Sequence, residues 1–155
     1  MTDATQVPGF VCVDHVAIAV CPGELEAQVL AYKALGFTEV HREDVLGSDQ
    51  VREVLLQVGS GPNLVQLLEP LTPESPVARQ IARNGGRGGM AHVALRVTDI
   101  QAAFDALAAR GFRIIDAAPR RGSRGTTVFF VHPRTTERAA FGYLLEVVQE
   151  GTPHG

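Results

Sequence analysis

Apolar residues alternate with other residues at a period of two in several short runs of the chain, which is typical of β-strands with one packed face. The clearest run, residues 14–20, places His15 with two alanines on one face and branched aliphatic residues on the other. A second run, residues 91–97, repeats the arrangement with His92 at the matching position. The pattern predicts two equivalent strands, each with a packed face and a face where a histidine stands beside small residues as in a cavity wall.

A helical segment is predicted after each of these strands, at residues 24–35 and 99–110. Thr98 is the predicted N-cap of the second helix. The two helices end at equivalent Gly-Phe pairs, and Gly36 and Gly111 fit the left-handed position that commonly terminates a helix. The chain therefore repeats a strand followed by a helix.

Three further strand-like runs complete each half of the chain. They span residues 38–42, 51–58 and 63–68 in the first half, and 113–116, 126–131 and 143–148 in the second. Turn residues separate them. Each half thus has the pattern βαβββ, and the predicted class is an α+β fold of two tandem modules.

The modules are predicted to cover approximately residues 11–70 and 90–150 of a single domain, residues 1–155. The linker, residues 71–89, begins with a predicted helix and ends in a glycine-rich joint. A strand follows these glycines where a phosphate-binding loop would need a helix, so the segment is interpreted as a linker.

Composition narrows the classes of function. Hydrophobic residues make up 45% of the chain and the net charge is -3, which gives no reason to expect nucleic acid or an anionic membrane as a partner. Cys12 and Cys21 have no CxxC partner and are interpreted as thiols in a reducing compartment. No apolar run approaches the roughly 20 residues of a membrane span, and residues 1–8 lack the apolar core of a signal peptide. A cytoplasmic protein is expected.

The last predicted strand of each half carries one polar residue in an apolar run, Gln66 in the first and Glu146 in the second. A carboxylate there is costly unless it is paired or binds a metal. Folding the halves about a pseudo-twofold axis would bring these residues together with His15 and His92. Two imidazoles, an amide oxygen and a carboxylate suit Co²⁺, Mn²⁺, Ni²⁺, Zn²⁺ or Mg²⁺. Each residue alone has a structural interpretation, and only the joint pattern favours one divalent ion per chain. The remaining histidines are interpreted as surface or turn residues: His41, His132 and His154.

An ordered set of motifs resembles the methylmalonyl-CoA epimerases of the vicinal oxygen chelate (glyoxalase/bleomycin resistance/dioxygenase) superfamily. The matching segments together extend from about residue 12 to 148 and comprise residues 14–20, 51–56, 65–70, 92–94, 119–123 and 130–133.

The resemblance implies two βαβββ modules forming an open, metal-lined β-cup, and a homodimer. It implies that His15, Gln66, His92 and Glu146 are the metal ligands, with Co²⁺ preferred. It assigns Glu53 as a catalytic base. Inversion needs acid–base groups on both faces of a planar enolate, and Glu146 is the second candidate. The residues alone leave open that Glu53 is a solvated strand carboxylate.

A basic turn precedes one predicted strand and contains Arg120, Arg121, Ser123 and Arg124. It is a candidate site for the phosphates of an acyl-CoA substrate, and a solvated arginine-rich turn is the alternative. Two segments depart from the family pattern. Residues 48–50 lack the usual Gln-Gly, and the loop of residues 134–142 is longer than usual.

Both departures are expected to border the acyl pocket, so methylmalonyl-CoA and a longer alkylmalonyl-CoA such as ethylmalonyl-CoA both stay open. Two competing functions also remain, a glyoxalase I-type lyase and a ligand-sequestering resistance protein of the same fold. Gln66 and the basic turn argue against the lyase. The four candidate ligands argue against the resistance protein.

Overall fold

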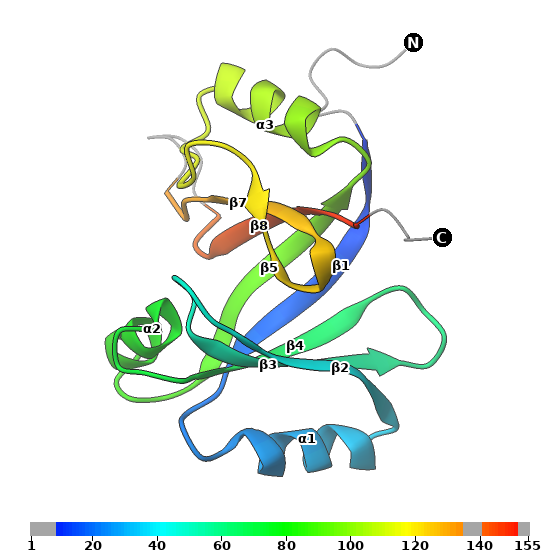
Figure 1. The fold of residues 1–155 in the computed structure, drawn as a ribbon, viewed down its shortest axis with the longest axis vertical. Coiled ribbons are helices and arrows are strands. Elements are labelled where there is room, and N and C mark those ends of the chain that lie inside the picture. Colours follow the sequence, from blue (N-terminus) through cyan, green and yellow to red (C-terminus); the bar gives the residue numbers. More distant parts are fainter. Residues whose placement is uncertain (1–8, 135–140, 152–155) are drawn as a thin grey trace. The chain divides into compact units, whose positions relative to one another are not determined.

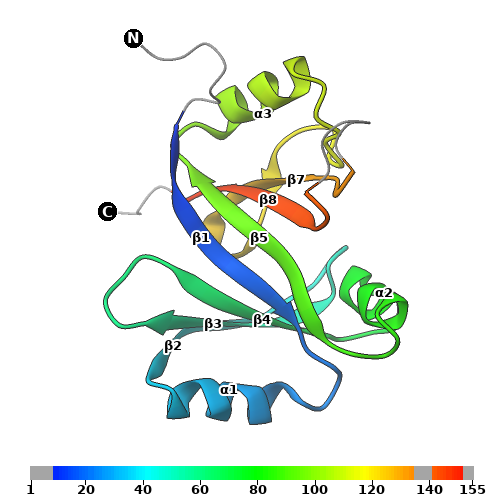
Figure 2. The ribbon, with the colours of Figure 1, turned by 180° about the vertical axis from the view of Figure 1, so that it is seen from behind.

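The computed structural model describes residues 9–134 and 141–151, and Figures 1 and 2 show the fold from opposite sides. The elements follow along the chain as β1 (Phe10–Ala19), α1 (Leu25–Ala34), β2 (Phe37–Val45), β3 (Val51–Val58), β4 (Leu64–Pro70), α2 (Pro76–Arg83), β5 (Gly89–Val97), α3 (Ile100–Ala109), β6 (Arg120–Arg121), a 3₁₀ turn (Ser123–Gly125), β7 (Thr127–Val131) and β8 (Leu144–Gln149).

The strands hydrogen-bond in the order β2-β3-β4-β1-β5-β8-β7-β6. β1 pairs in parallel with β4, and β5 pairs in parallel with β8. Within each half, the remaining neighbours are antiparallel. The two halves therefore share one connectivity. The predicted α+β class and its two tandem βαβββ modules are confirmed.

The chain forms two compact units whose boundaries differ from those of the modules. The first unit comprises residues 15–91, and the second comprises residues 1–14 with 92–155. The boundary passes through β1 between Asp14 and His15 and through β5 between Ala91 and His92. Each unit therefore contains part of both strands. His15 is the first residue of the first unit, and His92 is the first residue of the C-terminal segment of the second unit.

In the first unit, α1 covers one face of the strands (Figure 1). Alternate residues of β3 and β4 point to this face, as the period-two pattern predicts. The apolar cluster beneath the helix is fully buried and consists of Val20, Leu25, Val29, Val54, Leu56 and Leu67. The intervening residues of the same strands belong to the opposite face, so one face of the sheet is left for other chemistry.

The second unit repeats this division between its two sheet faces. α3 packs against β7 and β8 (Figure 2). The cluster on the helix side consists of Val97, Ile100, Ala103, Leu107, Phe129, Val131, Leu145 and Val147. A smaller cluster on the other face joins Ala94, Val128 and Val148, with Phe130 packed against it. The repeat seen in the sequence is therefore also a repeat of packing.

The predicted helices are present, with one correction at a helix start. Gly36 and Gly111 adopt φ values of 100° and 82°, which confirms the predicted left-handed terminators. Thr98 is not the N-cap of α3, because the helix begins at Ile100 and Asp99 directly precedes it. Asp99 takes that role, since its carboxylate accepts a hydrogen bond of 3.0 Å from the N–H of Ala102.

The predicted strand at residues 113–116 is also corrected. Within this segment only Ile114 forms a β-bridge, to Val131. The backbone of Ile115 donates to Phe130, and the carboxylate of Asp116 accepts from the N–H of the same residue. A side chain thus replaces the backbone partner that would continue the ladder, and the edge strand β6 forms four residues later.

The linker between the modules contains α2 and a glycine-rich turn, as predicted. At Gly88 a Cβ atom would lie 2.4 Å from the carbonyl oxygen of Ala19, so no other residue fits there without displacing backbone. Cys12 and Cys21 are free thiols. Among residues 9–134 and 141–151, no helix has both the length and the apolar character needed to cross a bilayer.

Candidate active site

Three buried polar side chains lie on the face of the first unit's sheet that points away from α1. The register pairs Gln66 with Ala17 of β1 and with Leu55 of β3. His15 and Glu53 are each two residues from these partners and therefore share the face with Gln66. His15 and Glu53 are 2% exposed and Gln66 is 7% exposed. The first unit thus gathers an imidazole, an amide and a carboxylate on one surface.

The side-chain oxygen of Gln66 is buried without a hydrogen-bond partner among the described residues. A buried polar atom left unsatisfied costs about 1–3 kcal/mol. A metal ion is a natural partner for an amide oxygen in this position. The site therefore fits a bound cation on an observation that is independent of any resemblance.

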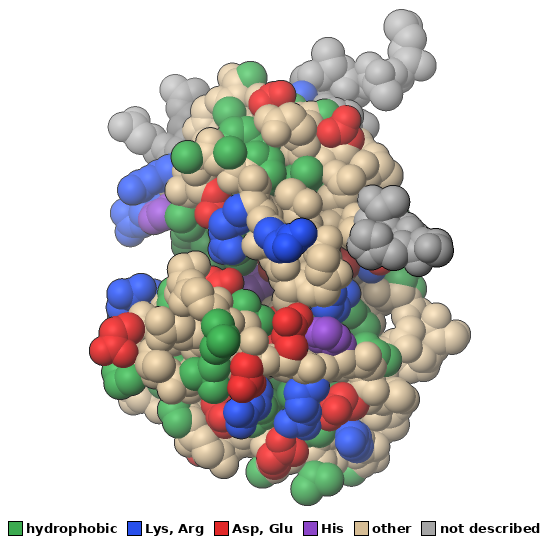
Figure 3. Space-filling model, viewed as in Figure 1, with side chains coloured by type: hydrophobic (Ala, Val, Ile, Leu, Met, Phe, Trp, Pro, Cys, Tyr) green, Lys and Arg blue, Asp and Glu red, His purple; other side chains and the backbone are tan. Residues whose placement is uncertain are grey.

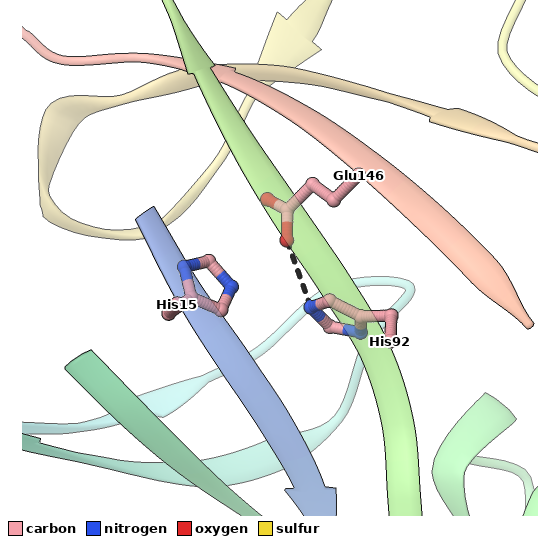
Figure 4. Close-up of side chains that lie close together, drawn as sticks. All are labelled: His15, His92 and Glu146. Atoms are coloured by element: carbon pink, nitrogen blue, oxygen red, sulfur yellow. Dashed lines mark ion pairs between the residues drawn. The ribbon is translucent and has the colours of Figure 1, made fainter. Parts of the chain in front are cut away.

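The second unit contributes a histidine and a carboxylate in direct contact. His92 Nε2 lies 2.8 Å from Glu146 Oε2, and the two side chains are 8% and 9% exposed (Figure 4). β5 and β8 hold them in place, since Ala94 pairs with Glu146 in their parallel ladder. Phe130 meets the His92 ring edge-on at 5.4 Å between centroids, a favourable arrangement for two aromatic rings.

The described residues include two groups of side chains that could hold a metal ion. In one of them the second unit supplies His92 and Glu146, from β5 and β8 (Figure 4). An imidazole and a carboxylate suit several divalent ions, so the donor types alone do not select one. The other group consists of His41, Glu43 and Glu53.

The arginines of the predicted basic turn have different surroundings. Arg120 donates to Asp116 at 3.0 Å, and its guanidinium lies 5.5 Å from the centre of the Phe130 ring. Arg121 is exposed. Ser123 is half-buried, and its carbonyl oxygen accepts from Thr126 to close the turn. Only part of the turn therefore presents its charge to solvent. On the face of the molecule shown in Figure 3, side chains of both charge signs are interspersed.

A buried ion pair that sequence reasoning missed supports the same turn. Asp14 is 0% exposed, and its carboxylate accepts from Arg96 at 2.8 Å. Arg124 also reaches Asp14, at 3.5 Å, from a backbone with a φ of 56°. Burial by itself lowers the pKa of Arg96, but the hydrogen bond and charge of Asp14 outweigh it and keep the pKa above its usual value. No local motif marks this pair, because 82 residues separate its partners.

His41 was interpreted as a surface or turn residue, and its side chain is 31% exposed. It lies in β2 with its Nε2 atom 2.8 Å from Glu43 Oε1. The only sequence signal was the spacing of two residues between His41 and Glu43, which puts both on one strand face. His132 does lie in a turn, where its Nδ1 atom accepts from the N–H of Arg134. His154 lies outside the described residues.

The long loop before β8 lies mostly outside the described residues, including Thr135, Thr136 and Glu137, which were expected to border the acyl pocket. Phe141 is described and belongs to the second unit. Its ring stacks on Phe112 at 6.1 Å and an interplanar angle of 10°. This aromatic side chain thus packs against the segment that follows α3.

Curated relatives match most of the chain. The Ethylmalonyl-CoA/methylmalonyl-CoA epimerase of Cereibacter sphaeroides is 34% identical over 78% of this chain and 87% of that protein. The mitochondrial methylmalonyl-CoA epimerase of Homo sapiens is 32% identical over 78% of this chain. The chain spans only 66% of the length of the human protein and 53% of the one from Dictyostelium discoideum.

The chain is also similar to solved structures of proteins with the same name as these relatives. The crystal structure of methylmalonyl-CoA epimerase from Mycobacterium tuberculosis is 30% identical, with a TM-score of 0.82 over 95% of this chain and 93% of that one. A methylmalonyl-CoA epimerase in complex with methylmalonyl-CoA and NH4+ is 32% identical, with a TM-score of 0.80 over 93% of this chain and 99% of that one. A family model also matches residues 14–130. The chain therefore belongs to the Glyoxalase/Bleomycin resistance protein/Dioxygenase superfamily, the family that its motifs resemble.

Proposed function

We propose that this chain is an epimerase that interconverts the 2R and 2S epimers of methylmalonyl-CoA or a related alkylmalonyl-CoA. The observation that carries the proposal is Glu53, a carboxylate 2% exposed on the same sheet face as the unsatisfied amide oxygen of Gln66. A buried carboxylate is costly unless it is paired, hydrogen-bonded or bound to a metal ion. Relatives and solved structures named as methylmalonyl-CoA epimerases support the substrate class.

In the proposed reaction, Glu53 removes the proton from the carbon between the thioester and the carboxylate. The resulting enolate is planar, and inversion requires a second group to return a proton to its opposite face. Glu146 is proposed for that step. Its contact with His92 at 2.8 Å holds one oxygen of the carboxylate in place.

We propose that His15, Gln66, His92 and Glu146 bind one divalent ion per chain, with Co²⁺ preferred. The donor set and the unsatisfied Gln66 oxygen support this assignment. When bound, such an ion supplies positive charge to the thioester and carboxylate oxygens of the substrate.

For the CoA phosphates we propose Arg120, Arg121 and Ser123. Arg121 is exposed and free to follow a phosphate, whereas Asp116 and Phe130 hold Arg120 in one orientation.

A homodimer in the cytoplasm is proposed on the family resemblance and on the two free thiols. A single domain of residues 1–155 is also proposed, since the two compact units share β1 and β5.

The test follows the α-proton of each epimer of methylmalonyl-CoA and ethylmalonyl-CoA separately by NMR in D2O. The expected result is loss of the α-proton signal together with appearance of the other epimer. The wild-type protein stripped of metal is the first control and Glu53→Gln is the second. If neither substrate exchanges its α-proton and the protein converts a glutathione thiohemiacetal, the epimerase assignment is rejected in favour of a glyoxalase I-type lyase. Binding of ligands without turnover would instead favour a sequestering protein.

A further inference from the structure

Two polar side chains of β2 lie beside Glu53 on the same face of the first unit's sheet. Glu43 pairs directly with Glu53 across the antiparallel β2–β3 ladder, and His41 pairs with Leu55. A register irregularity between Glu39 and His41 sets this alignment. The imidazole of His41 lies 2.8 Å from Glu43, and one ligand atom from each of His41, Glu43 and Glu53 lies within 4.8 Å of the others.

Exposure rises along this set of side chains. Glu53 is 2% exposed, whereas the side chains of His41 and Glu43 are 31% and 35% exposed. The buried carboxylate therefore has two ionisable neighbours that reach solvent. At separations below 4.8 Å, a proton passes either directly or through one intervening water.

A base in a two-base epimerase needs such a route. After one turnover the group that removed the α-proton is protonated, and the group that returned a proton has lost one. Before the next molecule of the same epimer can react, Glu53 must release its proton to solvent. A carboxyl group that is 2% exposed has little direct contact with water, so its neighbours must carry that proton.

We propose that Glu43 and His41 form a proton relay that restores Glu53 between turnovers, an inference that rests on the proposed role of Glu53 as a base. The O–H bond of protonated Glu53 breaks as an O–H bond forms on Glu43. That bond breaks in turn as an N–H bond forms on Nε2 of His41, and the imidazole releases a proton from Nδ1 to water. Proton exchange with water then returns the imidazole to the tautomer that is protonated on Nδ1, so that Nε2 can accept again. The cycle involves no oxidation or reduction.

The relay is distinguished from a structural role by the steady-state kinetics. Restoration of the free enzyme limits the rate only when substrate is saturating, so kcat falls while kcat/KM is preserved. In His41→Gln and Glu43→Gln we expect kcat to fall by roughly 10- to 100-fold. This loss is smaller than the usual effect of removing a group that transfers the substrate proton itself, about 10²–10⁴. We expect kcat/KM to stay within about twofold, since the chemical step is unchanged. Imidazole added to the buffer should restore kcat in His41→Gln.

The matched control is Asp44→Asn, which removes a carboxylate from the same strand on the opposite face. Asp44 binds Arg52 at 2.7 Å and lies next to Glu43 in sequence. We expect this variant to keep the kcat of the wild type. Circular dichroism and thermal melting of all variants separate loss of the relay from loss of the fold.

Several results would overturn the relay. They are an unchanged kcat in both relay variants, a parallel fall of kcat and kcat/KM without rescue by imidazole, and a second metal ion per chain that disappears in His41→Gln. The proposed function has its own test in Glu53→Gln. If that variant epimerises normally, the role of Glu53 is wrong, whereas an inactive Glu53→Gln beside a fully active His41→Gln rejects the relay alone.

Discussion

Gln66 combines an unfavourable burial of its amide oxygen with the role proposed for it as a metal ligand. Its buried amide oxygen has no partner among the described residues, so the protein without metal bears the cost of desolvating it. A ligand that binds only the folded state returns that free energy through mass action. Removal of this amide is therefore expected to raise the free energy of unfolding of the metal-free protein and to weaken its binding of metal.

Gln66→Leu should raise the free energy of unfolding of the metal-free protein by about 1 kcal/mol, because an unsatisfied polar group leaves the interior. The same change should reduce the rise in Tm that Co²⁺ produces in the wild type. Chemical denaturation with and without metal measures both effects. Gln57→Leu is the control, since the amide of Gln57 donates to Gly61 at 2.7 Å and its loss should only destabilise. An undiminished metal-induced shift in Gln66→Leu would remove Gln66 from the ligands.

Glu53→Gln should keep the bound metal and stop epimerisation, because loss of a positioned proton-transfer group typically costs about 10²–10⁴ in rate. If Glu146 is the second base, as proposed, exchange of the α-proton with D2O should persist for one epimer only. NMR with each epimer separately measures this asymmetry. Loss of exchange from both epimers would leave Glu53 as the sole base and exclude the two-base mechanism.

At the scale of elements, the two helices of the repeat start in different ways. α3 has a local N-cap in Asp99. Glu24, the N-cap residue of α1, makes no side-chain cap, and the carboxylate of Glu69 in β4 accepts from the N–H groups of Gly23 and Leu25 instead. Local sequence can mark the first kind of start but not the second, whose partner is more than 40 residues away.

Asp99→Ala should lower the free energy of unfolding by about 1 kcal/mol, the usual effect of removing a side-chain N-cap. Glu24→Ala, at the equivalent position of α1, should change it far less, because its carboxylate caps nothing in the structure. Urea denaturation of the two variants gives the comparison. Equal losses would show that Asp99 does not act as the cap.

The sequence allowed prediction of features that recur at equivalent positions of the two modules. The period-two runs around His15 and His92 and the glycine terminators of both helices belong to this class. Features that depend on pairing between distant segments could not be predicted. The placement of His41 beside Glu53 depends on an irregular β2–β3 register, and the buried pair of Asp14 with Arg96 joins the two modules' first strands. Neither has a motif, because the chain brings these partners together only after it has folded.

At the scale of the whole molecule, the two compact units are not consecutive along the chain. Residues 10–14 of β1 belong to the second unit and residues 15–19 to the first, and β5 is divided in the same way. If one unit unfolds, its residues in β1 and β5 leave the strands, and both strands are then incomplete in the other unit as well. A chain connected in this way is expected to unfold as one cooperative system, although its sequence is a tandem repeat.

Calorimetry of the metal-free protein should therefore show one transition, with a ratio of calorimetric to van't Hoff enthalpy near about 1. Leu56→Ala removes a fully buried side chain from the core of the first unit and should cost about 2–5 kcal/mol. Phe129→Ala makes the corresponding change in the second unit, at about 3–5 kcal/mol. Each variant should shift the single transition as a whole to lower temperature. The reason is that both units contain residues of β1 and β5, so a lower stability of one unit lowers the stability of the other. If Leu56→Ala instead splits the melt into a shifted and an unshifted transition, the units unfold independently and the single-domain proposal fails.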